Sequence, residues 1–252
     1  MAATDTVPAI KAVVFDAYGT LYDVQSVAAA IEAAFPGLGD YLTQVWRLKQ
    51  LEYSWLRSMM GRYADFRDVT RESLVYALGT VGLAADDTRL DRLVDAYATL
   101  APSPEAAETL AALGGYRLAI LSNGSPGMLR ALVSHSGLDR YFAAVISVDA
   151  KRVFKPDPRA YELVQETLGV LPHEVVFVTS NGFDVAGAGA FGFRVVRIER
   201  VTREAMQSEV QGGGAIGPAA MFRALRTQQE CLGYQPDIVL GSLSELPQAL
   251  TR

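Results

Sequence analysis

Cysteine and histidine are nearly absent from this chain of 252 residues, which contains one cysteine and two histidines. Because Cys231 has no cysteine partner, an internal disulfide and any metal motif that needs two cysteines are excluded, and a reducing compartment fits best. With only His135 and His173 available, a His-rich zinc site is excluded and a Ser-His-Asp triad is disfavoured.

Basic residues and long apolar runs are also scarce. The 28 Asp and Glu residues outnumber the 23 Lys and Arg residues and give a formal net charge of -5, whereas nucleic-acid binding needs clustered positive charge. No apolar run approaches the roughly 18 residues of a membrane-spanning helix, and the first residues lack the basic and apolar regions of a secretory signal. We expect a cytoplasmic protein without nucleic-acid or membrane partners, in which local positive groups hold any anionic substrate.

What the chain does contain is a regular alternation of strand and helix patterns. Hydrophobic residues make up 50% of the chain and charged residues 20%, as in ordinary globular proteins. Short apolar runs bounded by turn residues predict strands at 10–15, 116–121, 143–148, 174–179, 193–198 and 237–240. Helical patterns lie between most of these runs, at 103–113, 127–136, 158–168 and 183–191. This alternation predicts a parallel sheet covered by helices on both faces.

The first two predicted strands break the alternation, because the stretch between them reads as helix throughout, at 24–34, 42–60, 69–78 and 88–100. A cap subdomain over the carboxyl ends of the strands explains so long an insertion better than a single crossover does. The predicted fold is therefore α/β, with a Rossmann-like parallel-sheet core (10–22 and 101–252) and an inserted helical cap (23–100). We also expect a flexible N-terminal extension over 1–9 and an excursion at the sheet edge over 201–234.

Polar residues follow the predicted strands or their loops at four places, namely Asp16, Ser122-Asn123, Lys155, and Ser180-Asn181 with Asp184. In a parallel α/β sheet the ligand crevice lies beyond the carboxyl ends of the strands, which is where a nucleophilic Asp16 would sit. The Gly-Thr turn after it leaves backbone N-H groups that can hold an anion. Taken singly, each site has a plainer explanation as a turn, a helix cap or a solvated loop.

Together the four sites resemble the motifs of the haloacid dehalogenase superfamily, as Asp16-Ala-Tyr-Gly-Thr-Leu, Leu121-Ser122-Asn123-Gly124, Lys155-Pro156-Asp157 and Ser180-Asn181-Gly-Phe-Asp184. The segments 45–56 and 61–63 resemble the L-2-haloacid dehalogenases in particular. This resemblance implies hydrolysis of short L-2-haloalkanoic acids to D-2-hydroxy acids and halide, without metal or other cofactor, in a homodimer. His135 and His173 match no catalytic position of the family, so we expect both to be structural.

The residue two positions after Asp16 favours carbon-halogen cleavage over phosphoryl transfer. In the family's phosphatases a second Asp stands there, protonates the leaving group and helps to ligate Mg²⁺, whereas this chain has Tyr18. Mg²⁺ also needs carboxylates near the fourth motif, typically more than one, and this chain offers Asp184. Halides other than fluoride leave without a proton, so the missing acid does not hinder dehalogenation.

The proposed displacement gives the charged residues distinct roles. Asp16 would attack C2 opposite the halogen and form an ester, and Asp184 is the motif residue basic enough to activate the hydrolytic water. Lys155 would hold Asp16 ionised, because two carboxylates and a carboxylate substrate repel one another in a closed site. Neutral donors must offset the remaining negative charge, and the candidates are Ser122, Asn123, Asn181 and the N-H groups after Asp16, beginning with Ala17.

The resemblance adds three further residues to the catalytic set. It implies that Thr20 and Ser122 orient Asp16 and the substrate carboxylate, and it includes Ser180 in the fourth motif. Tyr161 either donates a hydrogen bond toward Lys155 and Asp184 or only packs its helix.

The departing halide needs a weakly hydrated cation, for which arginine is better suited than lysine, and Arg47 is the candidate. Helix periodicity places it at the margin of an apolar stripe, where a snorkelling or surface-paired arginine is the alternative. The resemblance favours the halide role and adds Asn123 and Phe183 to the halide cradle. It also implies a small pocket with apolar walls, although such side chains usually belong to the core: Tyr18, Leu51, Phe66 and Phe183.

Two positions depart from the family pattern, with Leu48 in place of Gln and Thr179 in place of Ser. Thr179 keeps a hydroxyl, whereas Leu48 removes an amide and would alter cap polarity or the accepted chain length. Two other functions stay open, a small-metabolite phosphatase of the same superfamily and a catalytically silent binding module. Tyr18 opposes the first, and the presence of Asp16, Lys155 and Asp184 opposes the second.

Overall fold

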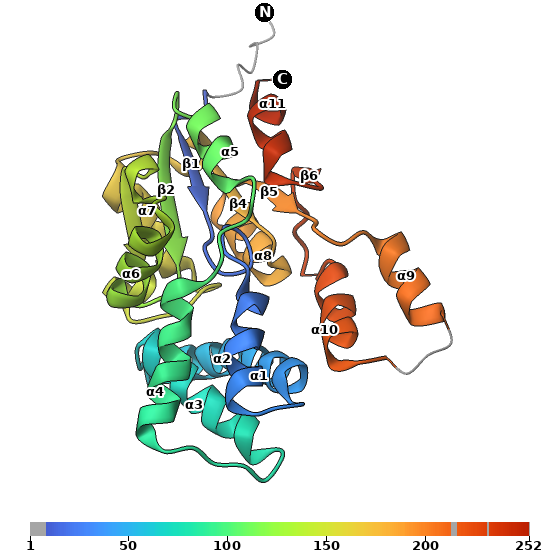
Figure 1. The fold of residues 1–252 in the computed structure, drawn as a ribbon. Coiled ribbons are helices and arrows are strands. Elements are labelled where there is room, and N and C mark those ends of the chain that lie inside the picture. Colours follow the sequence, from blue (N-terminus) through green and yellow to red (C-terminus); the bar gives the residue numbers. More distant parts are fainter. Residues whose placement is uncertain (1–8, 213–215, 231, 252) are drawn as a thin grey trace, which may run out of the picture.

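The computed structural model describes residues 9–212, 216–230 and 232–251, and it contains a six-stranded sheet flanked by helices (Figure 1). Its strands are β1 (Ala12–Phe15), β2 (Arg117–Ser122), β3 (Ala144–Ser147), β4 (Val175–Thr179), β5 (Arg194–Ile198) and β6 (Ile238–Leu240). Their order is β3-β2-β1-β4-β5-β6, and every neighbouring pair is parallel. The α/β class and the predicted strands are confirmed, with strand ends shifted by two residues or fewer.

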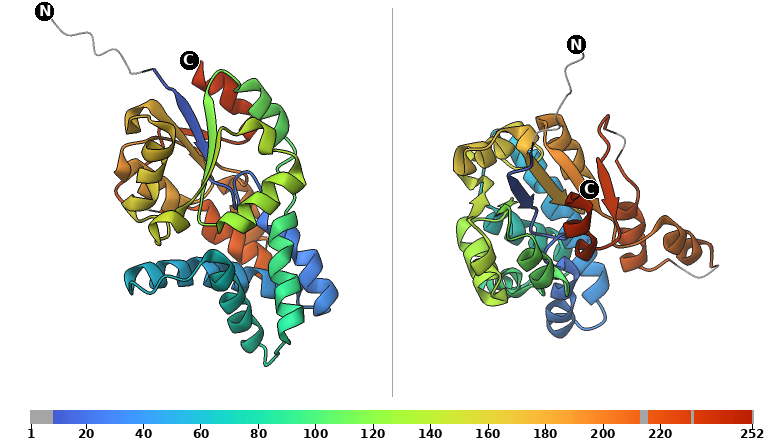
Figure 2. Two further views of the ribbon diagram at one scale, coloured as in Figure 1. Left: turned by 90° about the vertical axis from the view of Figure 1, so that its left-hand side faces the viewer. Right: turned by 90° about the horizontal axis from the view of Figure 1, so that it is seen from above.

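The central strands are buried on both faces. Every residue of β1 and β4 is buried, whereas the edge strands β3 and β6 alternate in exposure. The helices α7 (Pro158–Leu168) and α8 (Gly182–Phe191) pack together over one face, and α5 (Ala106–Ala112) and α11 (Leu246–Leu250) pack together over the other (Figure 2). The helix α6 (Pro126–Ser136) connects β2 to β3. This double cover is why the central strands read as continuous apolar runs.

The long insertion between β1 and β2 is helical, as predicted. After a 3-10 turn at Val24–Val27 it forms α1 (Ala28–Ala34), α2 (Gly39–Met59), α3 (Phe66–Gly79) and α4 (Asp87–Asp95), and it ends in a second 3-10 turn at Ala96–Thr99. Asp65 and Asp86 begin α3 and α4 by accepting N-H groups of their first turns. These helices gather beyond the carboxyl ends of the strands (Figure 1). The fully buried Trp46 connects α2 to α3, because its Nε1 donates a 2.7 Å hydrogen bond to the Thr70 carbonyl.

The irregular segment predicted at the sheet edge lies between β5 and the edge strand β6. It contains α9 (Arg203–Gln211) and α10 (Pro218–Thr227). Besides packing against α9, α10 packs against α2 of the insertion, a contact that the sequence did not predict. Residues 1–8 of the predicted N-terminal extension lie outside the described residues. In the part of the chain that the structure covers, no helix combines the length and apolar character that a membrane crossing requires.

Candidate active site

Asp16 directly follows β1. The strand order continues through β2 on one side of β1 and through β4 on the other, so the order of the strands reverses at β1. Such a reversal opens a crevice at the carboxyl ends of the strands. The chain then turns sharply, because the carbonyl of Ala17 accepts the N-H groups of Leu21 and Tyr22 at 3.0 Å, and Gly19 adopts a φ of 86° that favours glycine. The turn leaves Asp16 only 6% exposed, in the lining of the crevice.

Lys155 lies between two buried carboxylates. Its Nζ is 3.1 Å from Asp16 Oδ1 and 2.9 Å from Asp184 Oδ2, and it also lies 4.8 Å from the centroid of the Phe177 ring. Burial by itself would lower the pKa of Lys155, but the charges of Asp16 and Asp184 outweigh it and raise that pKa. The two carboxylates therefore favour the charged form of Lys155, and the solvated-loop alternative is wrong because Lys155 is 1% exposed.

The second oxygen of Asp16 is held by neutral donors. Its Oδ2 accepts the Thr20 hydroxyl at 3.2 Å and the Asn181 amide at 2.6 Å. Thr20 Oγ1 in turn accepts the backbone N-H of Ser180 at 2.9 Å, which ties the turn after β1 to the turn after β4. Thr179 keeps its part in this turn, since its Oγ1 accepts the N-H of Asn181 at 3.1 Å. The carboxylate is thus fixed by one cation and two neutral groups.

Asp184 is completely buried in the first turn of α8. Its Oδ1 accepts the Tyr161 hydroxyl at 2.7 Å, so the hydrogen-bonding alternative for Tyr161 is the correct one. Burial raises the pKa of Asp184 to about 6, while the Lys155 charge opposes the rise. Gly187 permits this approach, because a Cβ there would lie 2.4 Å from the Tyr161 hydroxyl oxygen. Asp184 is consequently a buried carboxylate that binds a proton at a higher pH than an ordinary aspartate does.

Arg47 projects from α2 into the same crevice and is 5% exposed, so the surface-arginine alternative is wrong. Its Nη1 donates to Gln50 Oε1 at 2.5 Å, and Gln50 Nε2 donates to Thr70 Oγ1 at 2.7 Å. Burial lowers the pKa of Arg47, with nearby Asp16 among the opposing charges. Since Gln50 is neutral, it positions the guanidinium without cancelling its charge.

Sequence reasoning missed Gln50, although its position three residues after Arg47 puts both on one helix face. It looked instead to position 48, where Leu48 lies half-buried. Gln50 supplies the amide that accepts a hydrogen bond from Arg47, so this bond does not depend on the residue at position 48.

These residues enclose a small pocket that brings together most of the predicted substrate contacts. We call it the active-site pocket, with a volume of about 10 Å³ and a lining of Asp16, Tyr18, Arg47, Leu51, Phe66, Asn123, Lys155, Asn181 and Phe183. The Tyr18 ring lies 5.5 Å from that of Phe66, and Trp55, which the sequence did not single out, packs edge-on against Phe183 at 5.3 Å.

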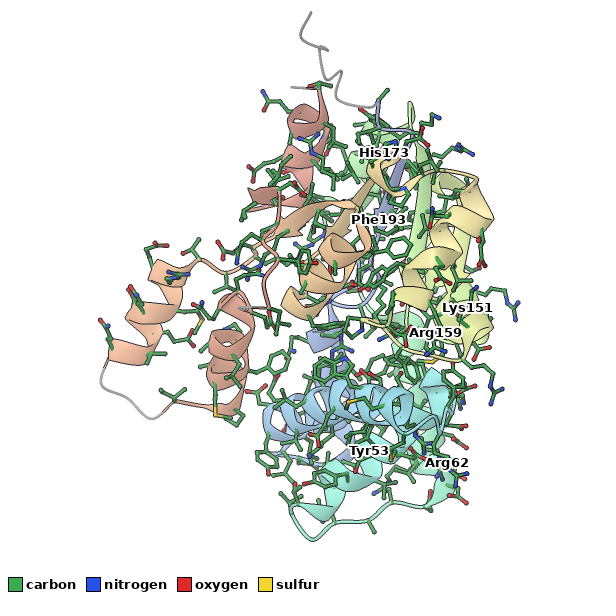
Figure 3. All side chains as sticks on the ribbon, turned by 180° about the vertical axis from the view of Figure 1, so that it is seen from behind. Tyr53, Arg62, Lys151, Arg159, His173 and Phe193 are labelled. Carbon is green, nitrogen blue, oxygen red and sulfur yellow. The ribbon has the colours of Figure 1, made fainter. Side chains whose placement is uncertain are left out.

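The remaining predicted residues make hydrogen bonds around the pocket or lie away from it, and among them Asn123 also belongs to the lining. The Ser122 hydroxyl accepts the Gly124 N-H at 3.2 Å, and the Asn123 amide oxygen accepts the Lys155 N-H at 2.9 Å. Ala17 contributes the carbonyl that closes the first turn. His135 and His173 are exposed outside the pocket lining, and Figure 3 shows His173 at the end of the core remote from the inserted helices.

The donor set is poorly suited to a metal ion. Within 9–212, 216–230 and 232–251, His, Cys, Asp and Glu side chains form no group of three or more that could hold one. Both site carboxylates, Asp16 and Asp184, are already bound to Lys155. The charges of Asp16, Asp184, Lys155 and Arg47 balance, so the pocket can receive one small anion beside Arg47.

Comparisons with known proteins place the chain in one family. Residues 10–192 match the haloacid dehalogenase-like hydrolase family. The chain is 59% identical over 239 residues to the (S)-2-haloacid dehalogenase of Xanthobacter autotrophicus (95% of this chain, 94% of the relative). It is 43% identical over 245 residues to (S)-2-haloacid dehalogenase 1 of Pseudomonas sp. strain CBS-3 (96% and 97%).

A solved structure is similar over nearly the whole length. It is that of the L-2-haloacid dehalogenase from Xanthobacter autotrophicus with chloropropionic acid covalently bound, with a TM-score of 0.94 and 58% identity. The match covers 96% of this chain and 98% of that one.

The bond between Arg47 and Gln50 yields a first prediction. Gln50→Glu replaces a neutral partner by a carboxylate that pairs with the guanidinium, so bromide affinity should fall at least about tenfold, equivalent to about 1.4 kcal/mol. Bromide quenching of tryptophan fluorescence measures the affinity. The control Gln50→Met adds no charge and should lose less. Equal bromide affinity in Gln50→Glu and the unsubstituted protein would show that the neutrality of Gln50 is irrelevant.

Proposed function

The chain belongs to the haloacid dehalogenase-like hydrolases and, among them, to the (S)-2-haloacid dehalogenases, and on this premise we propose how it hydrolyses the carbon-halogen bond of short L-2-haloalkanoic acids. One observation carries the mechanism: the Asp16 carboxylate is held by Lys155, Thr20 and Asn181 at a pocket that also holds Arg47. A nucleophile and a halide acceptor thus border one small volume.

In the first step an Asp16 oxygen attacks C2 of the substrate from the side opposite the halogen. A carbon-oxygen bond forms as the carbon-halogen bond breaks, and the halide leaves with the electron pair toward Arg47 and the edge of Phe183. Attack from the opposite face inverts C2, so an L-haloacid gives a D-hydroxy acid. The covalently bound chloropropionic acid in the Xanthobacter enzyme supports an ester on Asp16.

In the second step water attacks the carbonyl carbon of the Asp16 ester. Asp184 accepts one proton of the water, and the bond between the carbonyl carbon and the ester oxygen breaks. The leaving oxygen takes the second proton of the water, which releases the hydroxy acid and restores the Asp16 carboxylate with one oxygen from water. Asp184 then releases its proton to solvent. Tyr161 and Lys155 hold Asp184 for this role. Counting substrate, Asp16 and Asp184 against Lys155 and Arg47 leaves one surplus negative charge, which Thr20, Asn181, Ser122 and the Ala17 N-H offset.

We also propose that residues 10–22 and 101–252 act as the core domain and residues 23–100 as a cap that closes the pocket. The location of Arg47 on α2 and of Asp16 after β1 supports this division, because the site is complete only when both parts meet. The phosphatase alternative is disfavoured by Tyr18, which occupies the position of the second Asp and lines the pocket with its ring.

Single-turnover labelling tests the covalent step. With L-2-chloropropionate in H₂¹⁸O and no added metal, chloride should be released and one ¹⁸O should enter the peptide that contains Asp16, as measured by mass spectrometry. Asp16→Asn should lose turnover entirely. Chloride release without label in that peptide would contradict the ester. Hydrolysis of p-nitrophenyl phosphate that EDTA abolishes would indicate a phosphatase instead.

The role of Asp184 predicts both a trapped intermediate and a pH dependence. Asp184→Asn should accumulate the ester, because an amide cannot accept the water proton. Since burial raises the pKa of Asp184 to about 6, protonation below this pH removes the base. The rate of ester hydrolysis should therefore be constant above about pH 7 and fall about tenfold per pH unit well below 6. Rapid ester hydrolysis in Asp184→Asn would assign the base to another group.

We further propose that the enzyme is a cytoplasmic homodimer. The single cysteine suits a reducing compartment. Large apolar side chains stand exposed on the segment that carries α10, where Ile216 is 49%, Met221 51% and Leu225 57% exposed. A second copy of the chain would cover such a face.

Charge introduced into that face should dissociate the dimer. Met221→Glu combined with Leu225→Glu should convert a dimeric mass to a monomeric one in size-exclusion chromatography with light scattering. Met59→Glu, at a residue 76% exposed on the end of α2, is the matched control and should remain dimeric. Dissociation by Met59→Glu alone would move the interface to the inserted helices, and a monomeric unsubstituted protein would exclude the dimer.

A further inference from the structure

A second, larger cavity adjoins the active-site pocket. We call it the outer cavity. It measures about 190 Å³, and it is bordered by the start of the insertion, by the chain after β5 and by α10. Arg47 and Asn181 line both this cavity and the active-site pocket, so they form the partition between them.

The active-site pocket needs such a neighbour. Its volume of about 10 Å³ has room for about one water molecule, and the nucleophile within it is 6% exposed. A haloacid of two to four carbon atoms therefore reaches Asp16 only if a residue that lines the pocket moves. Of the two partition residues, Asn181 is bonded to Asp16 Oδ2 and the Tyr18 carbonyl, whereas the guanidinium of Arg47 is bonded to Gln50 of its own helix, α2. Movement of the Arg47 side chain would therefore join the two cavities without breaking a bond to the nucleophile.

The surface that lines the outer cavity is suited to anions. It carries four arginines against two carboxylates, in a chain whose net charge is -5; these are Arg47, Arg197, Arg200 and Arg223, with Asp23 and Glu199. Glu105 and Glu209 pair with Arg200 and Arg223 but do not line the cavity. Ser180 also borders it, and its buried hydroxyl has no hydrogen-bond partner in the part of the chain described.

The outer wall of the cavity comes from α10. Ala219, Phe222 and Arg223 of this helix face the cavity, and α10 packs against α2, the helix that carries Arg47. Phe222 is 7% exposed, so its ring belongs to the wall and not to the surface. The helix α10 thereby forms one wall of the route to Arg47.

We propose that the outer cavity is an anion vestibule through which short 2-haloalkanoates reach the active-site pocket and halide leaves it, with Arg47 as the movable partition and α10 as the outer wall. This inference rests on the proposed dehalogenation. The carboxylate of the incoming acid first contacts the arginine-rich lining and then binds to Arg47. The departing halide, already beside Arg47, follows the same path outward.

A bulky side chain on the wall tests the route. Ala219→Trp should fill the vestibule and lower kcat/KM about tenfold or more for 2-chlorobutanoate, and less for chloroacetate, because obstruction grows with substrate size. Ala205→Trp, the same change at an exposed residue of α9, should leave both values unchanged. A size-independent loss, or no loss, in Ala219→Trp would overturn the vestibule.

A change of charge without bulk provides a second measurement. Arg223→Gln should lower kcat/KM at low ionic strength by about two- to fivefold, and the difference should vanish above about 0.5 M salt, where charges are screened. Arg203→Gln, at an exposed arginine of α9 outside the cavity, should show no such difference. Salt-independent or absent effects of Arg223→Gln would contradict the anion route.

The two proposals fail in different ways. If the unsubstituted enzyme dehalogenates both substrates and Ala219→Trp keeps its kcat/KM, the vestibule is wrong while the dehalogenation stands. If the unsubstituted enzyme releases halide from no haloacid, the dehalogenation is wrong and the vestibule fails with it.

Discussion

The contact of one lysine with two carboxylates is the constraint on which the site depends. Asp16 and Asp184 are taken out of water almost completely, and isolated buried charges of this kind cost several kcal/mol each. Lys155, itself 1% exposed, compensates both at about 3 Å. Removing one member of such a buried set leaves uncompensated charge and typically costs about 3–5 kcal/mol. The three groups are therefore stable only together.

Neutral hydrogen bonds then assign different tasks to two chemically identical side chains. Asp16 accepts from Thr20 and Asn181, which fix its orientation at the edge of the pocket. Asp184 is more deeply buried, and its pKa is raised to about 6. The nucleophile is held in place, while the carboxylate proposed as the base has a pKa above that of an ordinary aspartate. Environment, and not residue type, separates the two functions.

Much of this arrangement was predictable from the sequence. The strand-helix alternation predicted the parallel sheet. The motifs predicted that Asp16, Lys155 and Asp184 lie together, because each follows a strand or its loop and the carboxyl ends of parallel strands meet at one edge of the sheet. Gln50, Trp55 and the packing of α10 on α2 were missed. Their roles depend on contacts between helices far apart in sequence, and helix periodicity gives the face of a side chain without naming its partner.

The sequence by itself determined the chemistry that the chain can perform. Asp16 stands at the end of a strand, and Tyr18 stands where a second aspartate would assist phosphate chemistry. Lys155 and Asp184 follow at the spacing of the later motifs, and Arg47 lies in the insertion. Only the tertiary structure decided that Arg47 is buried beside a neutral partner, that burial raises the pKa of Asp184, and that a second cavity meets the pocket at Arg47. The physical reason is that burial, pKa and enclosed volume depend on distances between segments, which one-dimensional order does not fix.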